Sequence, residues 1–189
     1  MTLVTTIENT LHNNSETFKE EVLKDFYTAI LSREASLVGR KEVLTGKAKF
    51  GILGDGKELP QLAMARAFKK GDWRSGYYRD QTFMFAIDEC TIEQYFAQLY
   101  ADAEGDPFSG GRQMNSHFAT PYVDRDGNWM PQKDLKNVSS DISCTAGQMA
   151  RAVGLALASK RYRESEKLNS STKFSNNGNE VIFLSLIHI

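Results

Sequence analysis

Two short segments of the sequence carry side chains that could hold a ligand or move a proton. Tyr78 and Arg79 are neighbours, and the arginine offers a planar fork of donors suited to phosphate oxygens. His117 lies in the stretch 110–118, whose glycines allow close approach of the backbone to a ligand, and an imidazole there can relay protons. From residue types alone, both segments also fit a structural role, the arginine as an ion pair and the histidine as a hydrogen-bonded loop residue.

Three patterns partly match known metal-binding or phosphate-binding motifs, but none of the matches is complete. The segment 54–56, Gly-Asp-Gly, resembles the start of a magnesium-binding motif, but no Asn-Asn pair follows about 30 residues later. It also lacks the Gly-Lys-Ser/Thr ending of a phosphate-binding loop, so we interpret it as a glycine turn. A calcium loop beginning at Asp124 would need a glutamate where Leu135 stands. The Asp126-Gly127 pair instead predicts a hairpin turn.

The composition is that of an ordinary globular chain. Its 189 residues are 41% hydrophobic and 25% charged, with a formal net charge of −1, which allows a sizeable core. Near-neutral charge argues against a dedicated nucleic-acid binder, and no apolar run reaches the roughly 18 residues of a membrane span. Two distant cysteines exclude a disulfide framework or structural zinc site. With no secretory or mitochondrial leader, we expect a cytoplasmic protein without a membrane or nucleic-acid partner.

The longest predicted element is a helix from Ser15, a suitable N-cap, to about Gly46. The polar residues 1–14 predict a flexible arm, which leaves 15–189 as the folded domain. An apolar stripe follows the helix at four-residue spacing and is widened by its neighbours; it comprises Phe18, Val22, Leu23, Phe26, Tyr27, Ile30 and Leu31. The polar face, which is predicted to be solvated or to face a partner, carries Arg33, Glu34, Arg40, Lys41 and Glu42.

The rest of the chain predicts shorter helices, two polar loops and one strand, an α/β pattern. Helices are predicted over 58–71, 81–86, 92–102 and 147–162, and loops over 103–145 and 163–179. The first loop is long enough to suggest a functional role. The helix 147–162 is rich in Gly and Ala, which predicts close packing and burial. The β-branched run 181–184 predicts a buried parallel strand.

Taken in order, three motifs resemble the α-type half of the decarboxylating component of 2-oxoacid dehydrogenase complexes. The segment 76–80, Gly-Tyr-Tyr-Arg-Asp, is similar to the Tyr-Arg segment that holds the pyrophosphate of thiamine diphosphate. Gly-Arg-Gln-Met at 111–114, followed by His117, is similar to a loop of the branched-chain members in which the histidine lines the active site. Residues 143–150 resemble the segment Ser-Pro-Leu-Ala-Thr-Gln-Ile-Pro, which contacts the cofactor and helps to build a potassium site. The resemblance spans about residues 18–184.

This resemblance implies the N-terminal, helix-rich part of the thiamine-diphosphate-binding fold, with the first parallel core strand near 181–185. It also implies roles for individual residues. Those that would hold or line the cofactor are Tyr78, Arg79, Ser143 and Thr145. His117 would face the acyl intermediate or lipoyl group as the catalytic residue, and Gln148 is a candidate potassium ligand.

The sequence departs from the family pattern at several positions. Cys144 and Ala150 replace prolines, and Gly147 replaces a threonine whose side chain would bind potassium. The strand 181–184 should lead into Gly-Asp-Gly, which supplies a magnesium ligand, but the chain reads Ser-Leu-Ile-His-Ile at 185–189. We therefore expect a truncated reading of a longer enzyme, with foreign sequence in its last few residues. Such a fragment would lack magnesium ligands and be inactive alone.

The implied reaction is oxidative decarboxylation of a 2-oxoacid, either branched-chain or pyruvate, with acyl transfer to a lipoyl group. Implied partners are a β-type subunit, separate or fused, and a lipoyl-bearing acyltransferase, and the full-length protein would be an oligomer. Two alternatives stay open. A transketolase-like transferase would share the cofactor and the fold, and a non-catalytic interaction module would use the exposed face of the helix 15–46.

Overall fold

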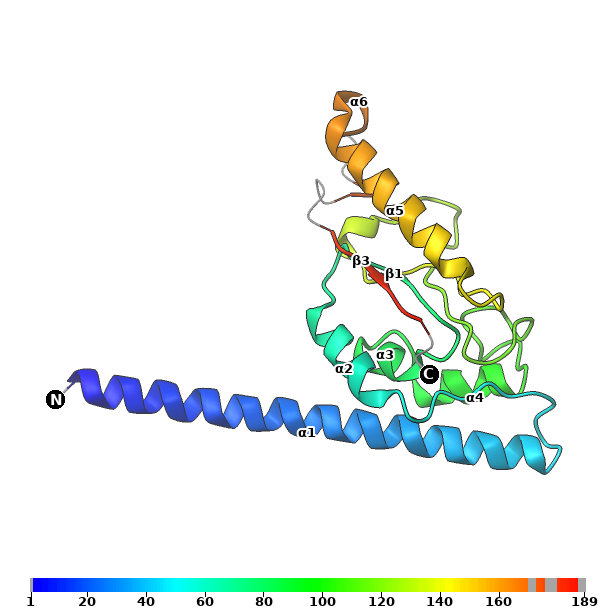
Figure 1. Cartoon of the computed structure of the whole chain (residues 1–189), viewed down its shortest axis with the longest axis horizontal. Helices are drawn as coiled ribbons and strands as arrows, with labels where there is room; N and C mark the ends of the chain where they lie inside the picture. Colours follow the sequence, from blue (N-terminus) through cyan, green and yellow to red (C-terminus); the bar gives the residue numbers. More distant parts are fainter. Residues whose placement is uncertain (1, 170–172, 176–179, 187–189) are drawn as a thin grey trace.

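The computed structural model describes residues 2–169, 173–175 and 180–186, with side chains from residue 17 onward except at 169. A three-stranded parallel sheet of order β2-β1-β3 lies at its centre (Figure 1). The strands are β1 (Trp73–Ser75), β2 (Asn137–Val138) and β3 (Ile182–Leu184). The α/β class and a parallel strand within 181–185 are confirmed. The prediction that this strand is buried is wrong, because β3 lies at an edge of the sheet and Leu184 is 41% exposed. That strand is the third and not the first, because strands as short as β1 and β2 show no detectable alternation.

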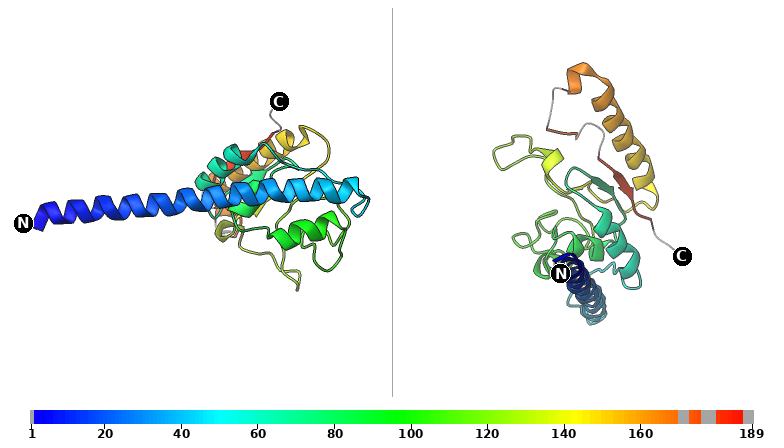
Figure 2. Two further views of the ribbon diagram at one scale, coloured as in Figure 1. Left: turned by 90° about the horizontal axis from the view of Figure 1, so that it is seen from below. Right: turned by 90° about the vertical axis from the view of Figure 1, so that its left-hand side faces the viewer.

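Helices cover both faces of the sheet. On one face lie α2 (Glu58–Ala67) and α3 (Gln81–Ala86), with α4 (Ile92–Leu99) beside them, and on the other lies α5 (Gly147–Glu164) (Figures 1 and 2). The core between α3 and the sheet is aromatic. Phe68 meets the rings of Phe83 and Phe183 edge-on, each at a centroid distance of 5.1 Å.

Helix α1 (Thr2–Leu44) forms an outer layer against α2, α3 and α4, and its N-terminal end projects beyond the body (Figures 1 and 2). It begins at Thr2 rather than after Ser15, so the predicted start of this helix is wrong. The division of the chain into a flexible arm over 1–14 and a domain over 15–189 stays a prediction. None of the helices in the described part of the chain is both long and apolar enough to cross a membrane.

The face of α1 that packs against the body consists of small residues. Its buried members are Thr28, Ser32, Ala35, Ser36 and Gly39. The Ser32 and Thr82 hydroxyls are 2.6 Å apart and tie α1 to α3. The expected polar face also contacts the body, since Arg33 donates to Glu58 at 2.7 Å. The large apolar residues of α1 are therefore left on its solvent side.

The prediction that the helix starting at Gly147 is buried is wrong. Helix α5 is mostly exposed, with Gln148 its one buried residue, although its small side chains predicted burial. Only one side of α5 lies on the short sheet, and Val153 on another side is 69% exposed. Helix α5 also extends to Glu164 and is followed by α6 (Glu166–Asn169), so the first part of the loop predicted over 163–179 is helical.

Several local predictions are confirmed. Helix α3 has the predicted bounds, and Thr91 and Gln94 form the capping box of α4. Helix α4 ends at Leu99 and not near 102, because Ala101 adopts a left-handed backbone (φ 57°) that stops the helix. The predicted hairpin forms through the antiparallel bridge between Val123 and Trp129.

The predicted glycine turn and the long loop also form. Residues 55–56 make a turn after Gly54. The loop over 103–145 is interrupted by β2 and by the 3-10 turn η1 (Gln132–Asp134). Residues 187–189, part of the segment expected to be foreign, lie outside the described residues.

Candidate functional site

Three segments that are distant in the sequence meet beside the carboxyl end of β1. Tyr78 lies in the turn after β1, His117 in the loop after α4, and Ser143 in the loop before α5. The rings of Tyr78 and His117 stack with centroids 5.4 Å apart. Nε2 of His117 lies 2.9 Å from the Ser143 hydroxyl. The structure therefore brings together residues from all three motifs that carried the family resemblance.

The His117 side chain is buried and its ring nitrogens face different partners. Nδ1 lies 3.3 Å from the carbonyl oxygen of Asn115, and the backbone carbonyl of His117 accepts from Gln98 at 2.7 Å. A carbonyl oxygen can only accept, so Nδ1 carries a proton in this arrangement. In the neutral ring Nε2 is then the acceptor, and the Ser143 hydroxyl donates to it. His117 thus presents a proton-accepting nitrogen toward an exposed hydroxyl.

The tyrosine pair 77–78 adds a polarised hydroxyl to this cluster. The Tyr77 hydroxyl donates to that of Tyr78 at 2.6 Å. This hydrogen bond lowers the pKa of Tyr78, and the Thr145 hydroxyl and the charge of Arg79 act in the same direction. Burial raises the pKa of Tyr77, and the contact with Tyr78 adds to that rise. Within the pair, Tyr78 therefore gives up its proton more readily.

Arg79 stands at the edge of the cluster with hydrogen-bonding capacity to spare. Its guanidinium lies 5.8 Å from the centre of the Tyr78 ring. Its Nε is buried and has no hydrogen-bond partner among the described residues. Arg79 also lines a cavity of ≈ 520 Å³ whose wall includes Arg40 and Asp55. An anion with several oxygens would satisfy such a donor.

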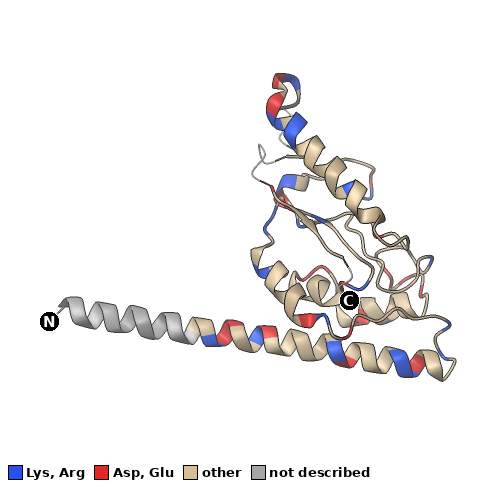
Figure 3. Cartoon of the chain, viewed as in Figure 1, with Lys and Arg blue, Asp and Glu red and all other residues tan. Residues whose placement is uncertain are grey.

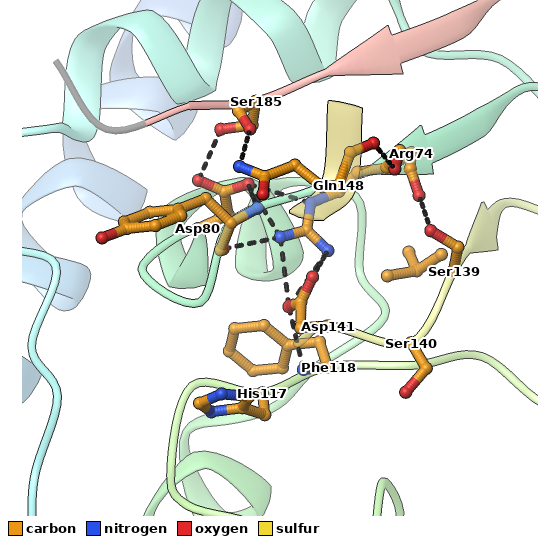
Figure 4. Close-up of polar contacts among 12 residues, drawn as sticks. Arg74, Asp80, His117, Phe118, Ser139, Ser140, Asp141, Gln148 and Ser185 are labelled. Carbon is orange, nitrogen blue, oxygen red and sulfur yellow. Dashed lines mark hydrogen bonds and ion pairs between the residues drawn. The ribbon is translucent and has the colours of Figure 1, made fainter. Parts of the chain in front are cut away.

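A buried ionic cluster that the sequence did not predict lies behind these residues (Figure 4). The Arg74 side chain is fully buried between two carboxylates. Its Nη2 donates to Oδ2 of Asp80 at 2.7 Å and to Oδ2 of Asp141 at 3.2 Å. Nη1 lies 3.2 Å from Oδ1 of Asp141, which is close enough for charge attraction although it lacks hydrogen-bond geometry.

The two carboxylates also hold the backbone of the site. Oδ2 of Asp80 accepts from the Tyr77 amide at 3.1 Å, and Oδ2 of Asp141 accepts from the Phe118 amide at 3.0 Å. Arg74 therefore links the turn that carries Tyr78 to the loop that carries His117. Burial raises the pKa of Asp141 despite the attraction of Arg74.

Gly76 is the one sequence signal that could have revealed this cluster. A Cβ at this position would overlap the Arg74 guanidinium, so only glycine lets that side chain fold back over the turn. An arginine two residues before a glycine is too common a pattern to be informative by itself.

Gln148, the candidate potassium ligand, is buried at the start of α5. Its Nε2 donates to the Ser185 carbonyl at 3.0 Å, and its own backbone carbonyl accepts from Ser75 at 2.8 Å. Ser185, which stands where the family pattern would begin its magnesium motif, donates through its hydroxyl to Oδ1 of Asp80 at 2.8 Å. Within the described ranges, no group of three His, Cys, Asp or Glu side chains is placed to bind a metal. The potassium role of Gln148 stays a prediction.

Comparison with known proteins gives two relatives. The 2-oxoisovalerate dehydrogenase subunit alpha of Bacillus subtilis (strain 168) is 30% identical over 150 residues, which cover 77% of this chain. The pyruvate dehydrogenase E1 component subunit alpha of Acholeplasma laidlawii is 31% identical over 88 residues, 46% of this chain. This chain is similar to the α subunits of 2-oxoacid dehydrogenases.

That similarity supports the expected family, but not the choice between two substrates, because the two relatives are named for different 2-oxoacid dehydrogenases. The matched residues make up 40% of the first relative and 25% of the second, so the chain spans well under half of either. No family model matches the sequence.

Proposed function

We propose that this chain is part of the thiamine-diphosphate-dependent decarboxylating component of a 2-oxoacid dehydrogenase. The observation that carries the proposal is the meeting of Tyr78, His117 and Ser143, with the unpartnered Nε of Arg79 beside them. Tyr78, His117 and Ser143 each come from a different one of the three motifs, and Arg79 is the neighbour of Tyr78 in the Tyr-Arg pair. A chance similarity in short motifs would have no reason to bring them into contact.

The residues present fit a diphosphate. Arg79 supplies a charged donor at the cavity edge, and the polarised Tyr78 hydroxyl supplies a second contact. The exposed hydroxyls of Ser143 and Thr145 would line the middle of the cofactor. When bound, thiamine diphosphate supplies the carbanion chemistry by which a 2-oxoacid loses carbon dioxide.

His117 would act on protons at the acyl or lipoyl end of the site. Its Nε2 is the acceptor of the neutral ring, and Ser143 holds the hydrogen bond that a reacting group would replace. The stack on Tyr78 fixes the plane of the imidazole, and Nδ1 is oriented by Asn115. The chain's own contribution is therefore to hold the His117 imidazole in a fixed orientation and to exchange one proton with the reacting group.

The residues present do not fit a magnesium site, and we derive no step through magnesium or potassium. Ser185 at the end of β3 is already engaged with Asp80. Gln148 uses its amide nitrogen to bind Ser185, which leaves its side-chain oxygen as the atom for the proposed potassium contact.

The proposed substrate is a branched-chain 2-oxoacid or pyruvate, the acids for which the dehydrogenases of the two relatives are named. A β-type subunit or half and a lipoyl-bearing acyltransferase are the proposed partners. The chain's Gly-Arg-Gln-Met loop at 111–114 favours the branched-chain acid.

Equilibrium binding of thiamine diphosphate to the purified chain tests the proposal. Arg79→Ala should weaken binding at least about tenfold, since it removes the charge-assisted hydrogen bonds to the diphosphate. Arg125→Ala, in the exposed hairpin, is the matched control and should bind like the wild type. Equal affinities of the wild type and Arg79→Ala would remove Arg79 from the site. A wild-type chain that binds no thiamine diphosphate would contradict the proposal as a whole.

A further inference from the structure

Helix α1 presents a group of large apolar side chains to solvent, here called the helix stripe. Its members, 45% to 67% exposed, are Phe18, Val22, Leu23, Phe26, Tyr27 and Ile30. They occupy the middle of α1, which runs from Thr2 to Leu44. Side chains of this size rarely stay uncovered together on a soluble domain.

The body of the chain does not compete for this surface. The body-facing residues of α1, such as Ser32, Ala35 and Gly39, lie on the opposite side of the helix from Phe26 and Ile30, given 3.6 residues per turn. Two acidic residues near the stripe are engaged toward the body, since Arg66 binds Glu21 and Asp25 at 2.7 Å each.

The extent of the helix stripe matches what a stable interface needs. With about 200 Å² for a whole aromatic side chain and somewhat less for an aliphatic one, the six side chains expose on the order of 700 Å². A standard protein–protein interface buries about 800 Å² on each partner. A patch on a monomer usually measures about 300–600 Å². One partner that covers the stripe alone would therefore complete an interface of ordinary size.

We infer that the helix stripe binds the same stripe of a second copy of this chain, with the two helices antiparallel. Phe18, Val22, Phe26 and Ile30 form a ridge at four-residue spacing, and two such ridges interdigitate in the commonest class of helix packing, at about −50°. A two-fold axis between Val22 and Phe26 sets Val22 against Phe26 of the second copy. The same axis sets Phe18 against Ile30 of the second copy, so each contact joins a phenylalanine to a β-branched side chain.

The antiparallel direction follows from the position of the bodies. Each body packs along the C-terminal part of α1, so antiparallel helices carry the two bodies away from each other (Figure 1). A parallel pair would place both bodies at the same end and set Phe26 against Phe26. Charged residues of both signs flank the stripe along α1 (Figure 3). Lys19, which lies within the stripe by its spacing, can lay its aliphatic stem along the apolar surface.

Sedimentation velocity of the whole 189-residue chain over a dilution series tests this inference. The wild type should sediment as a dimer. Val22→Lys and Phe26→Glu should each weaken self-association at least about tenfold, because each buries a charge against an apolar partner. The double variant should recover the dimer, since the lysine introduced in each copy then faces the glutamate introduced in the other. Val153→Glu, at an exposed apolar site on α5, is the control and should stay dimeric.

Other results would contradict the proposed antiparallel dimer or its register. A monomeric wild type would overturn the inference, and co-purification of that monomer with a β-type chain through the stripe would assign the stripe to another partner. A dimer that survives Phe26→Glu would show that copies meet elsewhere. Monomeric single variants without recovery in the double variant would overturn the antiparallel register. Because the substituted positions are exposed, circular dichroism of every variant should match the wild type. None of these outcomes depends on whether the chain binds thiamine diphosphate.

Discussion

The rings of Tyr78 and His117 lie nearly parallel, at 7°, with their centroids 5.4 Å apart. Tyr78 belongs to the turn after β1 and His117 to the loop after α4, so one stacking contact fixes the distance between two proposed site segments. The buried cluster of Arg74, Asp80 and Asp141 holds the same two segments from behind. The two segments are thus held together by the ring stack on one side and by the buried ionic cluster on the other.

The tyrosine pair should titrate unequally. The hydrogen bond from Tyr77 lowers the pKa of Tyr78, whereas burial raises the pKa of Tyr77. Absorbance near the phenolate band should therefore show one tyrosine that ionises below the ordinary value of 10.0. Tyr78→Phe should abolish this early phase, and Tyr77→Phe should move it upward. An unchanged early phase in Tyr78→Phe would assign it to another tyrosine.

Loss of Arg74 should be severely destabilising. Arg74→Met leaves Asp80 and Asp141 buried without their counter-ion, and breaking a buried pair in this way costs about 3–5 kcal/mol. Urea unfolding measures the loss. Arg66→Met is the control, because its acidic partners Glu21 and Asp25 remain in contact with water. Similar midpoints for the two variants would mean that the cluster does not hold the fold.

Glu58 should make the stability of the chain depend on pH. Burial opposes its ionisation, but hydrogen bonds from Arg33 and from the backbone outweigh that effect and lower the pKa of Glu58 below 4.5. A carboxyl with a lowered folded-state pKa stabilises the fold above its unfolded value, and this contribution is lost as the pH falls through the folded value.

Glu58→Gln should therefore be less stable than the wild type near neutral pH, and the difference should shrink as the pH falls below 4.5. Thermal unfolding across this pH range measures it. A difference that stays constant with pH would mean that the Arg33–Glu58 ion pair contributes nothing to stability.

Two glycine substitutions should have opposite signs. Gly76→Ala sets a Cβ against the Arg74 guanidinium, and crowding of this kind costs about 1–3 kcal/mol. Gly154→Ala, in α5, meets no atom within 4 Å, so it should stabilise the chain by about 0.5–1 kcal/mol through the entropy of the unfolded chain. Equal effects of the two substitutions on the free energy of unfolding would refute the packing argument at Gly76.

Sequence patterns predicted those elements whose signals are local. The capping box places the start of α4, and the β-branched run 181–184 places β3. Strands β1 and β2 were missed because they are two or three residues long, and β2 contains Asn137, a residue type depleted in strands. The exposure of the stripe on α1 was missed because tertiary packing, and not helical periodicity, decides which face is covered.

Some residues of the candidate site could be predicted from the sequence and others could not. Tyr78, Arg79, His117 and Ser143 were found through motif resemblance, which carries information about a whole family. Arg74 and Asp141 left no local signal beyond the uninformative Gly76, since their ion pair joins residues 67 positions apart. Long-range ion pairs of this kind are not identified by local patterns in a single sequence.

The order of the strands also has a consequence for synthesis of the chain. Strand β1 lies in the middle of the sheet, yet both of its neighbours come later in the sequence, and β3 docks through a hydrogen bond that spans 109 residues. At about 5–20 residues per second, a ribosome needs roughly 5–20 s to supply the missing strand. Strand β2 can pair with β1 earlier in that interval, but the other edge of β1 stays unpaired until β3 emerges.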